Sequence, residues 1–203
     1  MRVTAETQAA TRERIRRVAR QLFAAQGFEA TTTRDIARRA EIAAGTLFNY
    51  FTGKESIAAS LSAEAVAGVH RQFARGDFEA GSLEEDLFAF IAAGLRKLRP
   101  LRRFLPPVLE TRLSPLAADG QQDGQSLRVA HLEVVARLAR RHGFAELSPV
   151  ALQLYWSLYT GLLMFWASDD SPKQEDTLAL LDHSLEMFVG WLGGRSDESS
   201  VKS

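Results

Sequence analysis

Hydrophobic residues recur along most of the chain with the period of an α-helix. Near the N-terminus they fall at i, i+3, i+4, i+7 and i+8, on one helical face, and they are Ile15, Val18, Ala19, Leu22 and Phe23. Thr11 is a suitable N-cap for this helix, and Gly27 directly follows its expected last residue, Gln26. The pattern therefore predicts an amphipathic helix over residues 11–26, with residues 1–10 disordered.

The same periodicity predicts further helices after Gly27 and no strand. Capping boxes mark several helix starts, and Gly or Pro marks several ends. The further helices are expected at about 33–40, 43–50, 54–73, 83–98, 101–109, 126–142, 148–168 and 173–192. Residues 114–125 are polar and Gly-rich, which indicates a surface loop, and the tail from about residue 193 is expected to be disordered. The fold class predicted is all-α, with about nine helices.

Residues 31–54 form the most informative stretch of the chain. Thr32 and Asp35 are spaced as a capping box at the start of a short helix, and Glu41 and Ile42 provide a tight turn before a second one. The residues expected inside this unit are Ile36, Ala37, Ala40, Ile42, Leu47 and Phe51. A small residue, a turn and buried aliphatic residues at this spacing indicate a helix-turn-helix, which places its second helix in the DNA major groove.

At these residues the chain resembles the tetracycline-repressor (TetR) family of bacterial regulators. The shared signature is GF-x-A-T-T-x-R-D-I-A followed by GTL-F-x-YF-x-x-K-E, between Gly27 and Ile57. Two positions depart from the family pattern, because Glu41 replaces the usual Gly of the turn and Phe48 replaces a common Tyr. The resemblance implies a three-helix DNA-binding domain over residues 1–53 and a helical effector-binding and dimerisation domain over residues 54–203.

Candidate DNA contacts lie on both short helices. Thr32, Thr33 and Arg34 stand at a helix N-terminus, where backbone N–H groups favour a phosphate. The resemblance adds further positions, which are Ala44, Thr46, Phe48, Asn49, Tyr50 and Lys54. Asn49 could hydrogen-bond adenine, whereas Ala44 can only touch a thymine methyl, so DNA shape is expected to carry much of the specificity. The alternative is that Thr32 only caps and Tyr50 only packs.

The C-terminal part offers a candidate effector site. The helix expected at 148–168 is rich in aromatic residues, and in the resembling family a small-molecule pocket lies in the helical body. The candidate effector-binding residues are His70, Phe73, Arg96, His131, Trp156 and Tyr159. They suggest an apolar or aromatic ligand, and the alternative is that they only pack the core or a dimer interface.

The last two predicted helices are apolar around more than one face. Such helices must be covered on both sides, which a four-helix interface between two copies of the chain achieves. The candidate dimer residues are Leu154, Leu158, Gly161, Leu162, Phe165, Leu181, Leu185, Phe188 and Leu192. The alternative is a buried hairpin inside a monomer.

Composition and charge narrow the functional class. Residues 1–60 hold 10 Lys and Arg against 6 Asp and Glu, whereas the rest holds 15 against 19, which suits a DNA-binding head on an acidic body. The chain has no Cys, its four His lack metal-ligand spacing, and common catalytic motifs are absent, so we expect no enzyme, cofactor or metal site. From the sequence we expect that no run of about 20 apolar residues spans a bilayer and that no signal peptide is present. We therefore expect a cytoplasmic protein.

Together these features predict a homodimeric, TetR-like repressor that binds a palindromic operator and is released by a small molecule. An effector would move the helix at 54–73, so that the two DNA-binding domains of the dimer no longer match half-sites about 34 Å apart. One alternative is a helical ligand-binding or catalytic protein without a role in DNA binding. Another is a constitutive DNA-binding protein without an effector.

Overall fold

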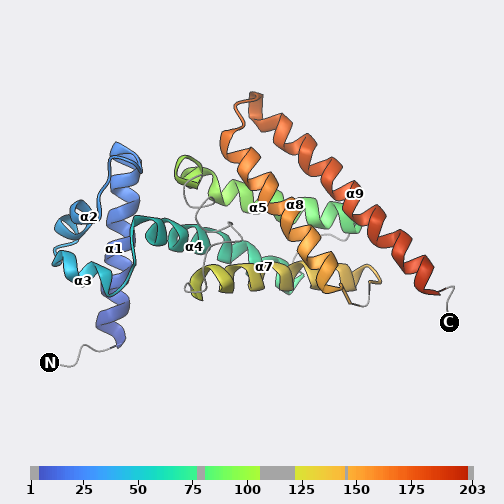
Figure 1. The fold of residues 1–203 in the computed structure, drawn as a ribbon, viewed down its shortest axis with the longest axis horizontal. Helices are drawn as coiled ribbons and strands as arrows, with labels where there is room; N and C mark the ends of the chain where they lie inside the picture. Colours follow the sequence, from blue (N-terminus) through green and yellow to red (C-terminus); the bar gives the residue numbers. More distant parts are fainter. Residues whose placement is uncertain (1–4, 77–80, 106–121, 145, 201–203) are drawn as a thin grey trace. The chain divides into compact units, whose positions relative to one another are not determined.

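A computed structural model describes residues 5–76, 81–105, 122–144 and 146–200 (Figure 1). The described residues form eight α-helices and two 3-10 helices, and no strand occurs among them. In chain order these are α1 (Ala5–Gln26), α2 (Thr33–Arg39), α3 (Ala44–Phe48), α4 (Lys54–Arg75), α5 (Leu83–Leu98), η1 (Arg99–Phe104), α7 (Gln122–Arg141), α8 (Pro149–Ser168), η2 (Pro172–Gln174) and α9 (Glu175–Ser200). The predicted all-α class is confirmed.

Two compact units share the chain. The head holds α1, α2, α3, the part of α4 up to Ala65, and η1 from Pro100. The body holds the rest of α4 from Val66, together with α5, most of α7, α8 and α9. The predicted boundary between residues 53 and 54 coincides with the start of α4, whereas the two units divide within that helix.

The head is built around the crossing of α2 and α3 beside α1 (Figure 1). Ile36, Ala40 and Leu47 are completely buried, and Ala37 is nearly so. The backbone N–H of Ile42 donates to the carbonyl oxygen of Ala37 at 3.0 Å, which closes the turn. Glu41 adopts φ +54° in this turn, so a non-glycine residue occupies the left-handed region.

The body is built on the α8–α9 hairpin, whose helices lie side by side with α5 against α9 (Figure 1). Ser148 caps α8 by accepting a hydrogen bond from the backbone N–H of Ala151 at 3.2 Å, and Pro149 follows at the first helical position. Trp166, Leu181 and Phe188 are each about 1% exposed and fill the interior of the body.

Several predicted helix ends were wrong. Helix α1 begins at Ala5, so residues 5–10 are helical, and the Thr11 hydroxyl donates to the Thr7 carbonyl oxygen at 2.9 Å instead of capping. Helix α3 ends at Phe48, which leaves Asn49 as its C-cap. Helix α9 continues to Ser200, so the predicted disordered tail from residue 193 is partly helical. Extending an existing helix costs much less than starting one, and Gly or Ser near an end is therefore tolerated.

Two predictions fall partly outside the described residues. The short helix expected at 101–109 corresponds to η1 up to Phe104, while residues 106–121 are not described. The loop expected at 114–125 is described only from Gln122, where α7 already begins. The hydrophobic period could not locate this start, because residues 122–126 carry no apolar stripe.

A buried carboxylate joins α8 to α9. Asp169 is the C-cap residue of α8 and is 6% exposed, and its oxygens accept hydrogen bonds from the backbone N–H groups of Ser171 at 2.8 Å and Thr177 at 3.0 Å. The Thr177 hydroxyl also donates to it. Burial alone would raise the pKa of Asp169, but the hydrogen bonds from Ser171 and Thr177 outweigh burial and hold that pKa well below its ordinary value.

We expect Asp169→Asn to destabilise the body by roughly 1–3 kcal/mol at neutral pH, because it removes charge-assisted hydrogen bonds. A depressed carboxylate pKa stabilises the fold above about pH 4 and ceases to do so as the pH falls towards the folded-state pKa. The difference between wild type and variant should therefore shrink between about pH 4 and pH 2. Urea unfolding followed by tryptophan fluorescence at several pH values measures it, with the exposed Asp182→Asn on α9 as control. A pH-independent difference would contradict this role.

Candidate DNA interface and effector cavity

Helix α3 presents a mixed surface to solvent. Ala44, Phe48 and Asn49 are exposed, and Phe48 is 54% exposed, whereas Thr46 and Tyr50 are half-buried. Tyr50 packs against the hydrophobic core of the head, which agrees with the alternative that this side chain has a packing role. All nine predicted DNA residues lie in the head, and Ala44, Phe48 and Asn49 are exposed on α3 or at its C-cap.

The start of α2 carries the second predicted DNA segment. Thr32 caps the helix, because its hydroxyl accepts from the backbone N–H of Asp35 at 3.1 Å while Asp35 accepts from the Thr32 N–H at 3.2 Å. The hydrogen bond from the Thr32 side chain lowers the pKa of Asp35. Thr33 is half-buried and Arg34 is exposed. The capping role of Thr32 is confirmed and leaves the side chain at the surface.

Lys54 has a structural contact that the sequence pattern did not reveal. Its ammonium donates to the carbonyl oxygens of Phe28 at 3.0 Å and Glu29 at 3.3 Å, and lies 4.4 Å from the centroid of the Phe28 ring. The side chain is only 19% exposed. Lys54 therefore ties the start of α4 to the turn between α1 and α2. No signal near position 54 points to a partner more than twenty residues earlier.

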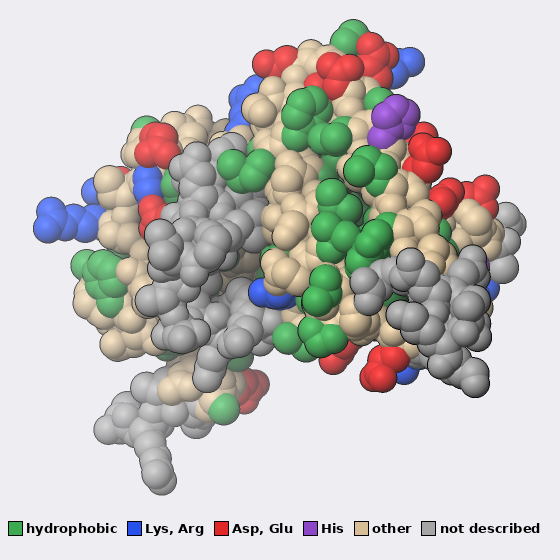
Figure 2. Space-filling view, turned by 45° about the vertical axis from the view of Figure 1, so that its right-hand side comes forward, with side chains coloured by type: hydrophobic (Ala, Val, Ile, Leu, Met, Phe, Trp, Pro, Cys, Tyr) green, Lys and Arg blue, Asp and Glu red, His purple; other side chains and the backbone are tan. Residues whose placement is uncertain are grey.

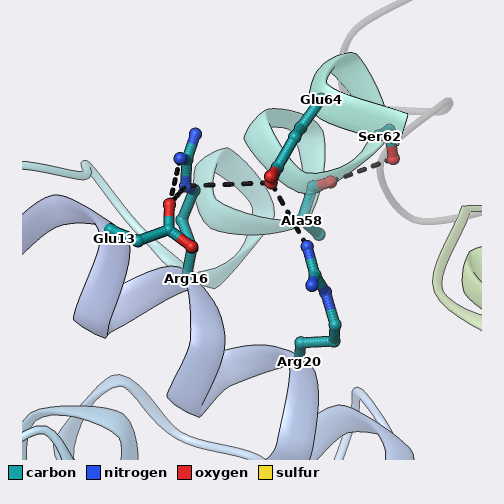
Figure 3. Close-up of polar contacts among 6 residues, drawn as sticks. All are labelled: Glu13, Arg16, Arg20, Ala58, Ser62 and Glu64. Carbon is teal, nitrogen blue, oxygen red and sulfur yellow. Dashed lines mark hydrogen bonds and ion pairs between the residues drawn. The ribbon is translucent and has the colours of Figure 1, made fainter. Parts of the chain in front are cut away.

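The arginines of α1 are used largely within the head (Figure 3). The Arg20 Nη2 atom lies 3.2 Å from Glu64 Oε2 on α4, and Arg16 Nε lies 4.0 Å from the same oxygen. Arg16 also pairs with Glu13 in its own helix. The Arg12 guanidinium lies 4.6 Å from the centroid of the Phe51 ring. Arg17, by contrast, is exposed.

A small cavity lies inside the body and involves three of the predicted effector residues. Its volume is about 10 Å³, room for roughly one water molecule. The lining residues are Val66, Val69, His70, Phe90, Ile91, Gly94, His131 and Tyr159. His70, His131 and Tyr159 were predicted from the sequence. Phe90 and Gly94 were missed, because buried residues on α5 look like ordinary core.

The other predicted effector residues lie around or outside this cavity. Phe73 is buried with its ring 5.2 Å from that of Phe90, and the Trp156 ring lies 5.6 Å from that of Tyr159. Both are therefore neighbours of the cavity-lining rings. Arg96 is exposed on α5 and is not among the lining residues, so the structure gives no support for its place in the site.

His131 is the centre of an aromatic cluster. Its ring stacks on Tyr159 with centroids 4.1 Å apart, and its Nε2 atom lies 3.0 Å from the Tyr155 hydroxyl. Burial, together with the nearby His70, lowers the pKa of His131 well below its ordinary value, and burial also lowers the pKa of His70. Both imidazoles are therefore neutral near pH 7. The cluster offers stacking surfaces and uncharged hydrogen-bonding groups.

The predicted dimer residues divide into two groups. Leu154, Gly161 and Phe165 are exposed on α8, and Leu158 is half-buried there. The other five are buried within the chain, and they are Leu162, Leu181, Leu185, Phe188 and Leu192. Their burial within the chain fits the alternative of a buried hairpin inside a monomer. These five side chains are therefore not exposed to a second copy of the chain. The exposed apolar residues of α9 are instead Leu178, Leu180 and Met187.

Exposed hydrophobic side chains gather on one face of the body (Figure 2). We call this the α8–α9 face and define it by Val150, Leu154, Gly161, Met164 and Phe165 on α8 with Leu180, Met187 and Gly190 on α9. Helix α8 is also long and apolar enough, by length and composition, to cross a membrane, contrary to the expectation from the sequence. Only 28% of that apolar window is buried within the chain.

The titratable residues do not assemble a metal site in the described part of the chain, where no group of three or more His, Asp or Glu side chains could hold an ion. His142 instead pairs with buried Asp86, with Nε2 and Oδ2 2.7 Å apart. This contact joins the end of α7 to the start of α5.

Comparison with known proteins shows what the head and the body resemble. Residues 15–61 match the model of the bacterial regulatory proteins of the tetR family, which spans most of the head. No curated protein matches the chain.

Solved structures extend the likeness beyond the head. FadR of Thermus thermophilus, a TetR-family transcriptional repressor in complex with lauroyl-CoA, has 22% identity and a TM-score of 0.70, over 88% of this chain and 93% of that one. A TetR regulator from Rhodococcus sp. RHA1 has 16% identity and a TM-score of 0.68, over 89% and 96%. FadR of Bacillus subtilis in complex with stearoyl-CoA has 20% identity and a TM-score of 0.57, over 87% and 97%.

The helix-turn-helix geometry of the head, the family match over the same residues and the shared fold along the body all agree. Residues 15–61 thus match the TetR-family model, and the chain shares the fold of solved TetR-family regulators.

Proposed function

We propose that this protein is a cytoplasmic, homodimeric repressor that binds a palindromic operator through α3 and releases it when a small molecule enters the body. The observation that carries the proposal is the recognition unit itself. Leu47 is completely buried in the head, and its packing holds α3 so that Ala44 and Phe48 face solvent. A helix held in this way can enter the major groove. A selection of operators from random duplexes, followed by binding measurements, tests the core of the proposal.

The α8–α9 face supports the proposed dimer. Met187 is 70% exposed and Phe165 is 41% exposed, so the face holds large apolar side chains that one chain leaves uncovered. Gly161 and Gly190 lie on the same face, and a Cβ atom at either would meet no neighbour within 4 Å. Small residues there would let a second hairpin approach closely. Two α8–α9 hairpins would thus form a four-helix interface.

Phe165→Glu and Met187→Glu should each weaken the dimer by at least about 100-fold, because an unpaired carboxylate would be buried at the interface. Sedimentation velocity at micromolar concentration measures the shift towards the 22.5 kDa chain. Val129→Glu is the matched control, since Val129 is 51% exposed on α7 and lies outside this face. A wild-type protein that sediments only as a monomer would exclude the proposed interface.

The body cavity supports a ligand site that opens on binding. Pockets for small molecules usually measure roughly 300–1,000 Å³, far more than the cavity of about 10 Å³ seen here. Tyr159 lines the cavity and carries a hydroxyl that can donate or accept a hydrogen bond. A ligand that separates the aromatic rings could pair with this hydroxyl and stack on His131. An aromatic or acyl-chain ligand fits such a lining.

Helix α4 offers a route from this cavity to the head. It is a continuous helix from Lys54 to Arg75, and Val66, Val69 and His70 on it line the cavity. Opening the cavity would displace this segment, and the start of the same helix is bonded to the turn at Phe28 and Glu29. We expect a coupling of roughly 1–3 kcal/mol between effector and operator, with reciprocal effects on both affinities.

Gly94→Ala tests the cavity, because a Cβ atom at Gly94 would meet no neighbour within 4 Å and Gly94 lines the cavity. The variant should be about 0.5–1 kcal/mol more stable and should bind ligand at least about tenfold more weakly. Titration of lauroyl-CoA and 1-naphthol, followed by tryptophan fluorescence, measures binding. Gly68→Ala, on the exposed side of α4, is the matched control, because it raises helix propensity equally but does not fill the cavity. Equal ligand affinities in both variants would argue against this site.

A second candidate function is a constitutive operator-binding dimer, which the small size of the cavity favours. Under this alternative, a ligand that binds the body leaves operator affinity unchanged. Operator affinity measured with and without a saturating ligand separates the two functions.

Lys54→Ala should weaken binding to operator and random DNA alike. Two of the ammonium's donors are used by carbonyl oxygens, and the exposed Glu29 carboxylate lies 3.7 Å from the ammonium, so a DNA phosphate would replace this ion pair. Loss of the phosphate contact should lower the salt slope by roughly 0.9 per head, because about one counterion fewer is released. The thermal midpoint should fall as well, since the link to the turn is lost. A lower midpoint with an unchanged slope would show a purely structural role.

Asn49→Ala provides the matching comparison. Asn49 is exposed at the C-cap of α3 and carries both a donor and an acceptor. If it reads a base, the variant should lose roughly 1–3 kcal/mol on the operator and little on random DNA, with an unchanged salt slope. Equal losses on both DNAs would instead indicate a backbone contact.

A further inference from the structure

The exposed surface of α3 is unusually poor in hydrogen-bonding groups for a helix that reads DNA. Between Ala43 and Asn49 the chain has no Arg, Lys, Gln, Glu or Asp. Thr46 and Asn49 are the two side chains there that can hydrogen-bond, and Thr46 is half-buried. Guanine is most often read by Arg or Lys and cytosine by Glu or Asp. This segment therefore lacks the usual groups for reading G·C pairs.

What the segment does offer is apolar surface. Phe48 is 54% exposed, and Ala44 lies four residues earlier, which puts both on one side of the helix. The ring is presented from a fixed position. Leu47 and Phe51 on either side are buried, and their backbone N–H···O=C bond measures 3.0 Å. An aromatic ring exposed to water on a rigid helix gains free energy where it finds an apolar partner.

The edges of base pairs in the major groove hold one apolar group, the C5-methyl of thymine. We propose that Phe48, together with Ala44, reads pyrimidine C5-methyl groups in the operator. This inference rests on the proposed function, because it requires α3 to enter the major groove. The two side chains are roughly 6 Å apart along the helix, about two base-pair steps of 3.4 Å. Each half-site should therefore present methylated pyrimidines within about two steps of each other.

The same chemistry extends to a modified base. The methyl group of 5-methylcytosine occupies the same ring position as that of thymine. A C·G pair at a contacted position should therefore bind better when its cytosine is methylated, although its hydrogen-bonding pattern is unchanged. Operator affinity would then respond to DNA methylation at these positions.

The test begins with an operator selected from random duplexes by the wild-type dimer. Each thymine of a half-site is replaced singly by deoxyuridine, which removes the methyl group and leaves the base pair intact. We expect one or two positions at which wild-type affinity falls about three- to fivefold, the loss expected for one buried methyl group. At those positions a 5-methylcytosine·G pair should bind better than a cytosine·G pair by a similar factor.

Two variants assign the effect to Phe48. Phe48→Ala should bind the thymine and deoxyuridine operators equally, whereas Phe48→Leu, which keeps an apolar contact, should retain part of the preference. Val129→Ala is the control, and it should keep the full preference for thymine. Far-UV circular dichroism verifies that each variant is folded, as the exposure of Phe48 leads us to expect.

Three outcomes would overturn the inference. If no single deoxyuridine changes wild-type affinity, methyl groups are not read, while operator binding itself still upholds the proposed function. If Phe48→Ala keeps the full preference for thymine, another residue makes the contact. If the selection yields no operator, the proposed function fails and this inference fails with it.

Discussion

The close crossing of α2 over α3 is the constraint on which the reading surface depends. Ala37 and Ala40 are small and buried where the two helices meet, and Ile36 and Leu47 fill the space beside them. A larger side chain at position 37 would push the helices apart, because cores are packed to near-crystal density. The direction in which Phe48 and Asn49 point is therefore set by residues that are buried inside the head.

Polar contacts then fix this unit to its surroundings. Lys54 donates hydrogen bonds to the turn after α1, and Glu64 forms ion pairs with Arg16 and Arg20 of α1 (Figure 3). The Arg–Glu pairs are largely exposed, so each contributes little on its own and weakens as salt rises. The Lys54 contact is more sheltered and involves backbone carbonyls. It is the stronger polar link between the start of α4 and the rest of the head.

The sequence predicted those features that depend on local pattern. Helical stripes such as Ile15 to Phe23 gave the elements, and the Thr32–Asp35 and Ser82–Glu85 capping boxes located two helix starts correctly. Features that depend on distant partners were missed. The Lys54 contact spans more than twenty residues, and Leu181, Leu185 and Phe188 look alike whether a hairpin or a dimer covers them. Arg96 was a candidate for the effector site because it would supply a polar group, but it is exposed on α5 and does not line the cavity.

The left-handed turn at Glu41 changes how substitutions at that position should be understood. A residue with a Cβ atom at φ +54° is strained, and β-branched side chains are strained most. Gly and Asn relieve this strain without touching any DNA-facing atom. The amino acids tolerated at position 41 are thus filtered by backbone stereochemistry, before nucleic-acid recognition is involved. A loss of regulation caused by Val or Ile at this position would report a misdirected recognition helix, even though the substituted side chain itself makes no contact with the operator.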